Sequence, residues 1–158
     1  MWDIVTATRE NVFSVERWMG SSEDIDWSFE QLQKALVNPK YVLRLAVSSE
    51  VGEKQVISAG VGFLLAHFVG EECTLMMVGV DVPSRCKGVG RQLTQDLLLQ
   101  AKNRGASYIF LEVRESNAPA IALYNSFGFE RCGERAGYYP AQTADKPKEA
   151  ALIMRLGL

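Results

Sequence analysis

The stretch VGVDVPSRCKGVGRQL, residues 78–93, joins an apolar strand to a helix through a turn with two closely spaced glycines, Gly88 and Gly90. Glycines let the main chain approach a ligand closely. The free N–H groups at a helix start point toward that ligand, with the helix dipole behind them. The segment therefore predicts an anion site, and the expected anion is a phosphate.

Two common glycine motifs do not fit this turn. A P-loop would end in Gly-Lys-Ser/Thr, but Arg91 and Gln92 follow Gly90. A dinucleotide-binding turn would have a third glycine or an alanine where Leu93 stands. Glu112 does lie about 20 residues further on, as a ribose-binding acid would, so that match is partial. A lone Gly-x-Gly also fits a tight strand-to-helix turn that binds nothing.

Composition and charge indicate one globular domain over residues 1–158, of which 47% are apolar and 23% charged. The formal charge is −2 and no basic run stands out, so nucleic acid is not an expected partner. The N-terminus lacks a basic region followed by an apolar run, and no stretch approaches the roughly 20 apolar residues of a membrane helix. We therefore expect a cytoplasmic protein without a membrane partner.

The cysteines and the histidine argue against a metal site or a disulfide framework. Cys73, Cys86 and Cys132 are an odd number with no CxxC pair, which fits a reducing compartment. With His67 as the single histidine, a His-rich metal centre or a Ser–His–Asp hydrolase has little to build on. No metal is expected.

The pattern of apolar residues predicts a mixed α/β (α+β) fold with six to seven strands and helices on both faces of the sheet. Helices are expected at residues 11–19, 27–37, 91–104 and 117–127. Strands are expected at residues 2–7, 41–47, 55–69, 73–82, 108–113, 129–138 and 150–156. Short connections between the second, third and fourth strands favour an antiparallel meander. Three paired strands before the glycine turn are unusual for a dinucleotide-binding unit, so a nicotinamide-dependent oxidoreductase is disfavoured.

Three segments carry a family resemblance that extends over nearly the whole chain. The run RCKGVG, residues 85–90, resembles the Arg/Gln-x-x-Gly-x-Gly/Ala signature of the GCN5-related N-acetyltransferases (GNATs). The run LEVRESNAPAIALYNSFGF, residues 111–129, is similar to the RimI-like ribosomal-protein-alanine N-acetyltransferases, in which LEVR, SN, A-x-x-LY and GF recur at this spacing. The run RAGYYP, residues 135–140, resembles the Tyr-Tyr-Pro loop of that subfamily.

The resemblance implies a GNAT fold and acetyl-CoA as co-substrate. In this fold the strand that contains Val78 and Val80 splays away from the strand at residues 108–113, and its exposed backbone pairs with the pantetheine arm. The expected phosphate-binding residues are Arg85, Lys87, Gly88, Val89, Gly90 and Arg91. For Lys87, solvated surface charge is the alternative interpretation.

Glu112 is the candidate general base. It is the one acid in an otherwise apolar strand, on the same face as Phe110 and Arg114. Burying a carboxylate is costly without partners, so either a catalytic role or an ion pair with Arg114 or Arg131 would account for it. The resemblance favours the role of base, acting directly or through water.

Tyr124 is the candidate general acid, and Asn117 lies two helical turns before it. In the family the matching tyrosine faces the coenzyme sulfur and can protonate the leaving thiolate. The alternative for Tyr124 is a core tyrosine with a satisfied hydroxyl. Asn117 is expected to cap its helix, with Pro119 in the first turn, and by resemblance to bind the pantetheine arm.

The expected acceptor-binding residues are Trp27, Glu112, Tyr138 and Tyr139. Trp27-Ser28 matches a Trp-Ser of relatives, but Asp26 stands where proline is common. One of the two tyrosines could instead serve packing. The acidic loop of residues 20–26 could attract a cationic peptide start, or simply be solvated.

The leading hypothesis is an N-terminal α-amine acetyltransferase that transfers acetyl directly in a ternary complex, as a monomer or weak dimer. Its expected acceptor is the N-terminal alanine of a small-subunit ribosomal protein. The alternatives are a GNAT enzyme for a small amine, an antibiotic or a lysine side chain, and a non-catalytic acyl-CoA-binding module. Because a mere binder needs neither Glu112 nor Tyr124, the last alternative is disfavoured.

Overall fold

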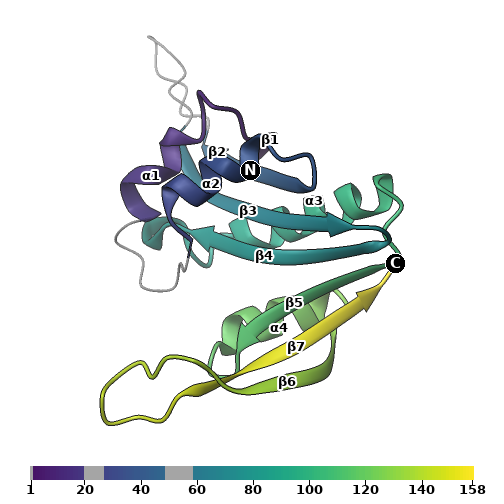
Figure 1. The fold of residues 1–158 in the computed structure, drawn as a ribbon. Helices are drawn as coiled ribbons and strands as arrows, with labels where there is room; N and C mark the ends of the chain where they lie inside the picture. Colours follow the sequence, from purple (N-terminus) through teal and green to yellow (C-terminus); the bar gives the residue numbers. More distant parts are fainter. Residues whose placement is uncertain (1, 20–26, 49–58) are drawn as a thin grey trace.

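The computed structural model describes residues 2–19, 27–48 and 59–158, and they form one seven-stranded sheet flanked by helices (Figure 1). The helices are α1 (Phe13–Met19), α2 (Phe29–Leu36), α3 (Val89–Asn103) and α4 (Ala118–Ser126), with a short 3-10 helix η1 (Val82–Ser84). The strands are β1 (Asp3–Thr6), β2 (Tyr41–Ser48), β3 (Ala59–Val69), β4 (Glu72–Val80), β5 (Tyr108–Arg114), β6 (Glu130–Tyr139) and β7 (Glu149–Gly157).

The predicted element order is confirmed, and the main differences lie around the glycine turn. The fourth strand ends at Val80 rather than at Val82, because Pro83 lacks an amide donor and a 3-10 turn follows. Helix α3 begins at Val89, two residues before the predicted start. Residues 55–58, predicted as part of the third strand, lie outside the described residues.

The strands are ordered β1-β2-β3-β4-β5-β7-β6, and every neighbouring pair is antiparallel except β4 and β5. The last strand, β7, therefore lies between β5 and β6. Although β5 and β6 are not neighbours in the sheet, only one strand separates them, so long side chains of β6 can contact side chains of β5.

The sheet opens between β4 and β5. The two strands pair only where Glu72–Leu75 runs beside Tyr108–Leu111. A register shift between Leu65 and Ala66 of β3 leaves Met76 as an extra residue in β4. Such a bulge bends its strand and increases the local twist. Beyond it β4 and β5 diverge, as Figure 1 shows, so the predicted splay is confirmed.

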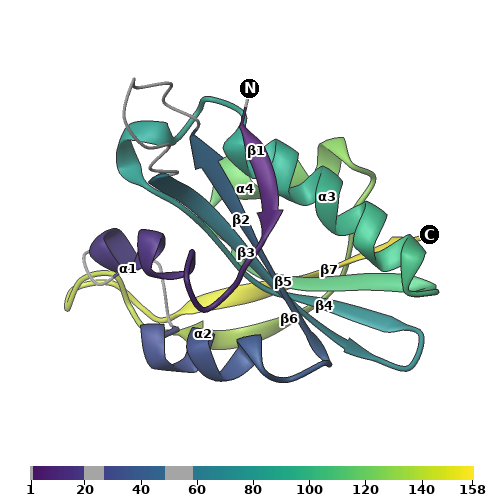
Figure 2. The same cartoon turned by 90° about the horizontal axis from the view of Figure 1, so that it is seen from above.

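Two hydrophobic cores hold helices on opposite faces of the sheet, with α1 and α2 on one side and α3 and α4 on the other (Figure 2). The alternation of β2 sorts its side chains between them: Leu43 and Leu45 pack under α1 and α2, whereas Val42 and Ala46 face α3. Within the described residues, no helix is long and apolar enough to cross a bilayer.

Candidate active site

The glycine turn forms an uncapped helix start. Gly88 is the N-cap of α3, with φ of +87°, and no side chain caps the helix there. Because a positive φ is strained for other residues, the turn requires glycine at this position. A Cβ on Gly88 would meet nothing within 4 Å, and one on Gly90 would meet only Leu123, at 3.5 Å. Because no side chain caps the helix, its first N–H groups are available to an anion.

Side-chain hydrogen bonds stabilise this turn, and one of them comes from Trp2, which is distant in the sequence. The indole N–H of Trp2 donates to the carbonyl of Lys87 at 3.3 Å, and Arg85 Nε donates to the carbonyl of Val80 at 3.2 Å. Val89 is buried in the core, so it can offer only its backbone to a ligand. The guanidinium of Arg91 lies against the end of α4, since it donates to Ser126 Oγ at 3.3 Å and covers the Phe127 ring.

Helix packing at this turn depends on a glycine that the sequence patterns did not single out. A Cβ on Gly62 of β3 would lie 2.9 Å from Val89 Cγ1 and 3.0 Å from the carbonyl oxygen of Gly79. Gly62 therefore lets the start of α3 sit close to β3 and β4. Only the packing itself reveals this role.

The diverging edge of β4 adds a second binding element. Val78 and Val80 are half-buried, and β5 pairs with β4 only as far as Leu75. A backbone edge that lacks a neighbouring strand can pair with the amides of an extended ligand. An anion-binding helix start beside such an edge fits a ligand with phosphates and an amide-bearing arm, which describes coenzyme A.

Asn117 caps α4 as predicted. Its Oδ1 accepts a hydrogen bond from the Ala120 N–H at 3.2 Å, and proline occupies the first turn. The cap fixes the start of the helix that carries Tyr124 on its second turn.

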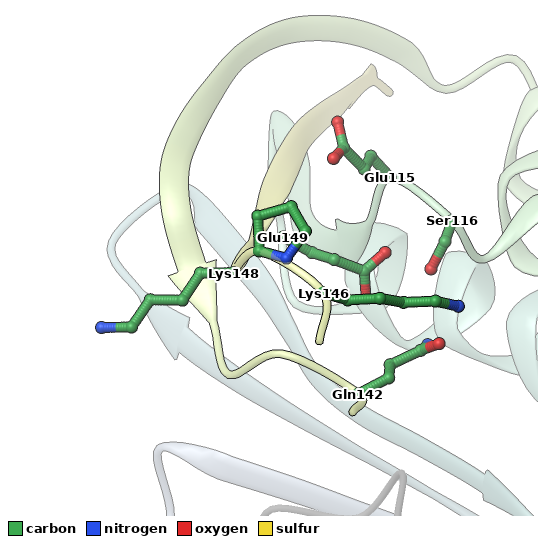
Figure 3. A pocket seen from close by; sticks show the side chains of 7 residues that line it. Glu115, Ser116, Gln142, Lys146, Lys148 and Glu149 are labelled. Carbon is green, nitrogen blue, oxygen red and sulfur yellow. The ribbon is translucent and has the colours of Figure 1, made fainter. Parts of the chain in front are cut away.

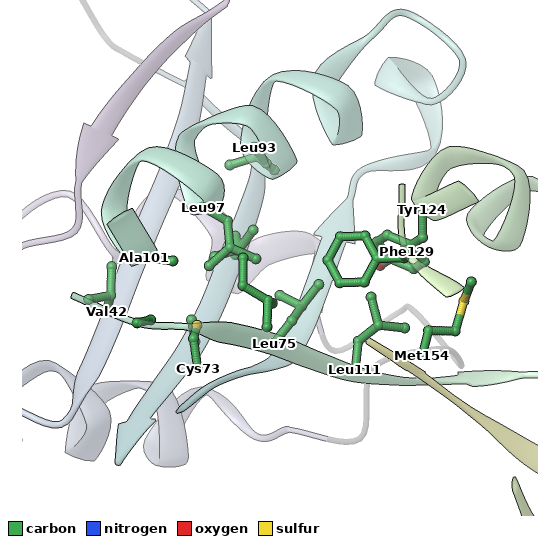
Figure 4. Close-up of a cluster of buried hydrophobic side chains, with 14 of the residues drawn as sticks. Val42, Cys73, Leu75, Leu93, Leu97, Ala101, Leu111, Tyr124, Phe129 and Met154 are labelled. Carbon is green, nitrogen blue, oxygen red and sulfur yellow. The ribbon is translucent and has the colours of Figure 1, made fainter. Parts of the chain in front are cut away.

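Tyr124 lies at the inner side of α4 with 8% of its surface exposed, and its ring packs against Phe129 at 5.7 Å (Figure 4). Burial, with a smaller contribution from Tyr139, raises the pKa of Tyr124 to about 12. The phenol therefore keeps its proton throughout the physiological range. That state is the one a general acid needs.

Glu112 faces the opposite side of the sheet. Its neighbours Leu111 and Val113 point into the core beneath α4, so alternation places the carboxylate on the other face, half-buried. Glu112 Oε1 lies 3.0 Å from Arg135 Nε of β6. The expected ion-pair partners were wrong: Arg114 pairs with Glu149 and Arg131 with Glu134.

Tyr138 and Tyr139 occupy an irregular end of β6. Between the pairs Arg135↔Ala151 and Tyr139↔Glu149 the ladder shifts, and Gly137 has φ of +60°. The two rings meet edge to face at 5.1 Å. Tyr139 is half-buried beneath the Arg114 guanidinium, whereas Tyr138 is 51% exposed. The packing role therefore falls to Tyr139, whereas about half of Tyr138 is exposed to solvent.

Trp27 is not joined to this group by a contact that the structure describes. Its ring packs edge to face on Tyr41 at 6.2 Å, and Tyr41 stacks on His67 at 4.5 Å. This aromatic row packs against the core under α1 and α2. The acidic loop of residues 20–26 lies outside the described residues.

A hollow of about 240 Å³ lies between the segment after β5 and the loop before β7 (Figure 3). Lys146 reaches toward Ser116 there, whereas Lys148 points away from the hollow. Both signs of charge line it, so it does not select one kind of ion. In the part of the chain that the structure describes, no three His, Cys, Asp or Glu side chains gather as metal ligands would.

Besides Gly62, sequence reasoning missed Trp2 and Arg135, and it considered the wrong partner for Arg114. Trp2 supports the turn at Lys87, but it lies just before the short strand β1 in a segment with no motif of its own. Arg135 and Arg114 both belong to the quoted motifs, yet the contact of Arg135 with Glu112 and that of Arg114 with the Pro140 carbonyl depend on the insertion of β7.

A family model described as the Acetyltransferase (GNAT) family matches residues 14–129. The [Ribosomal protein bS18]-alanine N-acetyltransferase of Escherichia coli is 43% identical over 94 residues, which cover 60% of this chain and 62% of that protein. The protein of the same name from Haemophilus influenzae is 28% identical over 145 residues, 92% of this chain and 89% of that one.

The fold matches a crystal structure of the ribosomal-protein-S18-alanine N-acetyltransferase from Escherichia coli. The TM-score is 0.83 at 29% identity, over 99% of this chain and 94% of that one. The match in shape thus extends beyond the segment that aligns at 43% identity.

Proposed function

This chain belongs to the acetyltransferase (GNAT) family, and on that basis we propose that it is an acetyl-CoA-dependent acetyltransferase for N-terminal α-amines. The favoured acceptor is the N-terminal alanine of ribosomal protein bS18, because the relatives are named as alanine N-acetyltransferases of that protein. We place the reaction in the cytoplasm, where ribosomal proteins are made.

The observation that carries this proposal is the placement of Glu112 and Tyr124 on opposite faces of the splayed sheet. Glu112 lies on β5, at the side away from α4, and Tyr124 lies on α4 itself. The uncapped start of α3 lies beside the same opening. A thioester held by the turn and the edge of β4 would lie between a proton acceptor on one side and a proton donor on the other.

The proposed chemistry is a direct transfer in a ternary complex. The acceptor arrives as an ammonium, and the Glu112 carboxylate takes one proton from it, directly or through water. The neutral nitrogen forms a bond to the acetyl carbon and releases its second proton to solvent, and the bond from that carbon to sulfur breaks. Tyr124 gives its phenolic proton to the leaving thiolate, which departs as a thiol. The Tyr124 oxygen then regains a proton from solvent after it has protonated the thiolate.

An α-amine makes modest demands on the base. Its pKa lies near 7.7–8.0, so a substantial fraction is already neutral at physiological pH, whereas lysine at about 10.4 is almost fully charged. A partly exposed carboxylate that forms an ion pair with Arg135 is a sufficient base for an amine that is already partly neutral. This supports an α-amine acceptor over a lysine side chain.

A peptide panel read by mass spectrometry tests the proposal. It contains a peptide that begins with alanine, its α-acetylated twin that retains one lysine, and a polyamine. We expect acetyl-CoA-dependent acetylation of the free α-amine alone. Modification of the blocked peptide or the polyamine, with the free α-amine untouched, would contradict the assignment.

A further inference from the structure

We propose that Arg114 is a positioning residue that anchors the tyrosine loop, residues 138–140, to the strand that carries Glu112. The inference rests on the proposed function, because it assigns this loop to the acceptor side of the site.

One guanidinium makes all the contacts on which the anchor depends. Arg114 Nη1 donates to the Pro140 carbonyl at 3.1 Å and to Glu149 Oε2 at 3.0 Å. The same guanidinium covers the Tyr139 ring, 4.4 Å from its centroid. Two of these three contacts reach the tyrosine loop, and the third reaches the strand that follows it. Arg114 therefore contacts the chain at both ends of the connection between β6 and β7.

The third partner is itself fixed. Glu149 is the first residue of β7, and the ion pair leaves 21% of the Arg114 side chain and 16% of the Glu149 side chain exposed. Hydrogen bonds from Ser116 and Arg114 lower the pKa of the Glu149 carboxyl, which stays ionised at neutral pH. A charged, largely shielded pair is a firmer attachment than an exposed one.

The sheet register explains how the anchor serves Glu112. Arg114 of β5 and Arg135 of β6 face the same β7 residue, Ala151, one on each side. Arg135 holds Glu112 and lies 5.3 Å from the centroid of the Tyr138 ring. The two arginines thus tie the two tyrosines to one face of β5, two residues from the candidate base.

We expect that a lysine at position 114 would not make the same set of contacts as Arg114. The planar guanidinium can donate to two oxygens while its face rests on a ring, whereas an ammonium is a point charge on a flexible stem. Arg114→Lys keeps the charge and removes this combination. Arg155→Lys is a matched control, because Arg155 of β7 covers the Tyr108 ring at 5.4 Å at the far end of the β5–β7 ladder.

The test compares the kinetics of the two variants with an alanine-initiated peptide. For Arg114→Lys we expect the KM for the peptide to rise about tenfold, the ratio that corresponds to losing one charge-assisted hydrogen bond. The KM for acetyl-CoA should not change, and Arg155→Lys should match the parent protein in both constants. Equal peptide KM values for all three proteins would overturn the proposal.

Amide hydrogen exchange over residues 138–148 gives a second measurement that needs no activity. Exchange should quicken there in Arg114→Lys and not in Arg155→Lys. Unchanged exchange would overturn the anchor whatever the acceptor is. Faster exchange in a protein whose parent acetylates no α-amine would support the anchor and contradict the proposed function, so the two failures are distinguishable.

Discussion

Arg135 Nε lies 3.0 Å from Glu112 Oε1 although β7 separates the strands that carry these two residues. The arginine engages one oxygen of the carboxylate, and we expect Oε2 to accept the proton of the acceptor amine. The pair is partly solvated, with 27% of the Glu112 side chain exposed. Arg135 therefore holds one oxygen of the candidate base and leaves part of the carboxylate exposed to solvent.

Replacing Glu112 by glutamine keeps the size of the side chain and removes its proton-accepting charge. We expect Glu112→Gln to lower kcat by about 100-fold, since a positioned base contributes factors of this order. Binding of acetyl-CoA, measured by calorimetry, should not change. The control is Glu134→Gln on β6, whose partner Arg131 lies on the exposed surface. A Glu112→Gln enzyme within about threefold of the parent would exclude the role of base.

The strands and helices of this chain were predictable because each one repeats a local pattern. In β5, Ile109, Leu111 and Val113 alternate with polar or half-exposed residues, and this alternation alone places Glu112 opposite the core. The cap at Asn117 was predictable for a similar reason, since its hydrogen bond spans only three residues.

The contacts of the candidate base were not predictable in this way. Glu112 pairs with Arg135 because β7 inserts between β5 and β6, a choice of strand order that no local pattern encodes. The same insertion turns Arg114 toward Glu149. The support that Trp2 gives to Lys87 likewise joins residues that are far apart in the chain. These contacts depend on which distant segments of the chain pack together, and short sequence motifs do not predict that.

Tyr124→Phe removes the phenolic hydroxyl that is the candidate acid and keeps the aromatic ring. The ring should stay against Phe129, so we expect binding of acetyl-CoA and the folded structure to persist. Turnover should fall by about 100-fold, the order of effect that a positioned acid supplies. Pre-steady-state acetylation separates chemistry from product release. Unchanged single-turnover rates would show that another group protonates the thiolate.

The pH profile tests the state of Tyr124 directly. Burial raises its pKa to about 12, so the phenol stays protonated where an ordinary tyrosine begins to ionise. We therefore expect no decrease of kcat/KM from ionisation of Tyr124 up to about pH 10. A falling limb centred near pH 10 that disappears in Tyr124→Phe would contradict this environment.

The raised pKa of Tyr124 also has a consequence for stability. A folded-state pKa above the unfolded value near 10 gives stability that is full below about pH 10 and is lost as the pH rises toward 12. The alkaline loss of unfolding free energy should therefore be shallower in Tyr124→Phe than in the parent protein. Urea titrations across this range would measure the difference, and parallel curves would contradict it.

The two glycines at the ends of α3 allow a comparison of variants that distinguishes an effect on ligand binding from an effect on backbone strain. Gly88 and Gly105 have φ of +87° and +73°, and a Cβ on either would meet nothing within 4 Å. Replacing either by alanine should cost about 1 kcal/mol of folding free energy through backbone strain. Only Gly88→Ala should also raise the Kd for coenzyme A, by about tenfold or more, because its methyl group would occupy the path to the phosphates. Equal Kd values for both variants would place the phosphates elsewhere.

The ion pair between Arg44 of β2 and Asp96 of α3 holds the helix whose start forms the glycine turn. Arg44 Nε lies 2.7 Å from Asp96 Oδ2, Nη2 lies 3.0 Å from Oδ1, and each side chain is 13% exposed. Asp96→Asn leaves the guanidinium shielded without its counter-charge, so we expect it to lower the unfolding free energy by about 3 kcal/mol.

The exposed pair between Lys34 and Glu30 provides the control for this prediction. Both of its side chains are 75% exposed, and the two residues lie one turn apart on α2. Because solvent screens such a pair, Glu30→Gln should change the unfolding free energy by less than about 0.5 kcal/mol. Urea denaturation with a common m-value would measure both variants. A similar small loss in both would show that the Arg44–Asp96 pair does not fix α3, and that apolar packing of Leu93 and Leu97 holds the helix unaided.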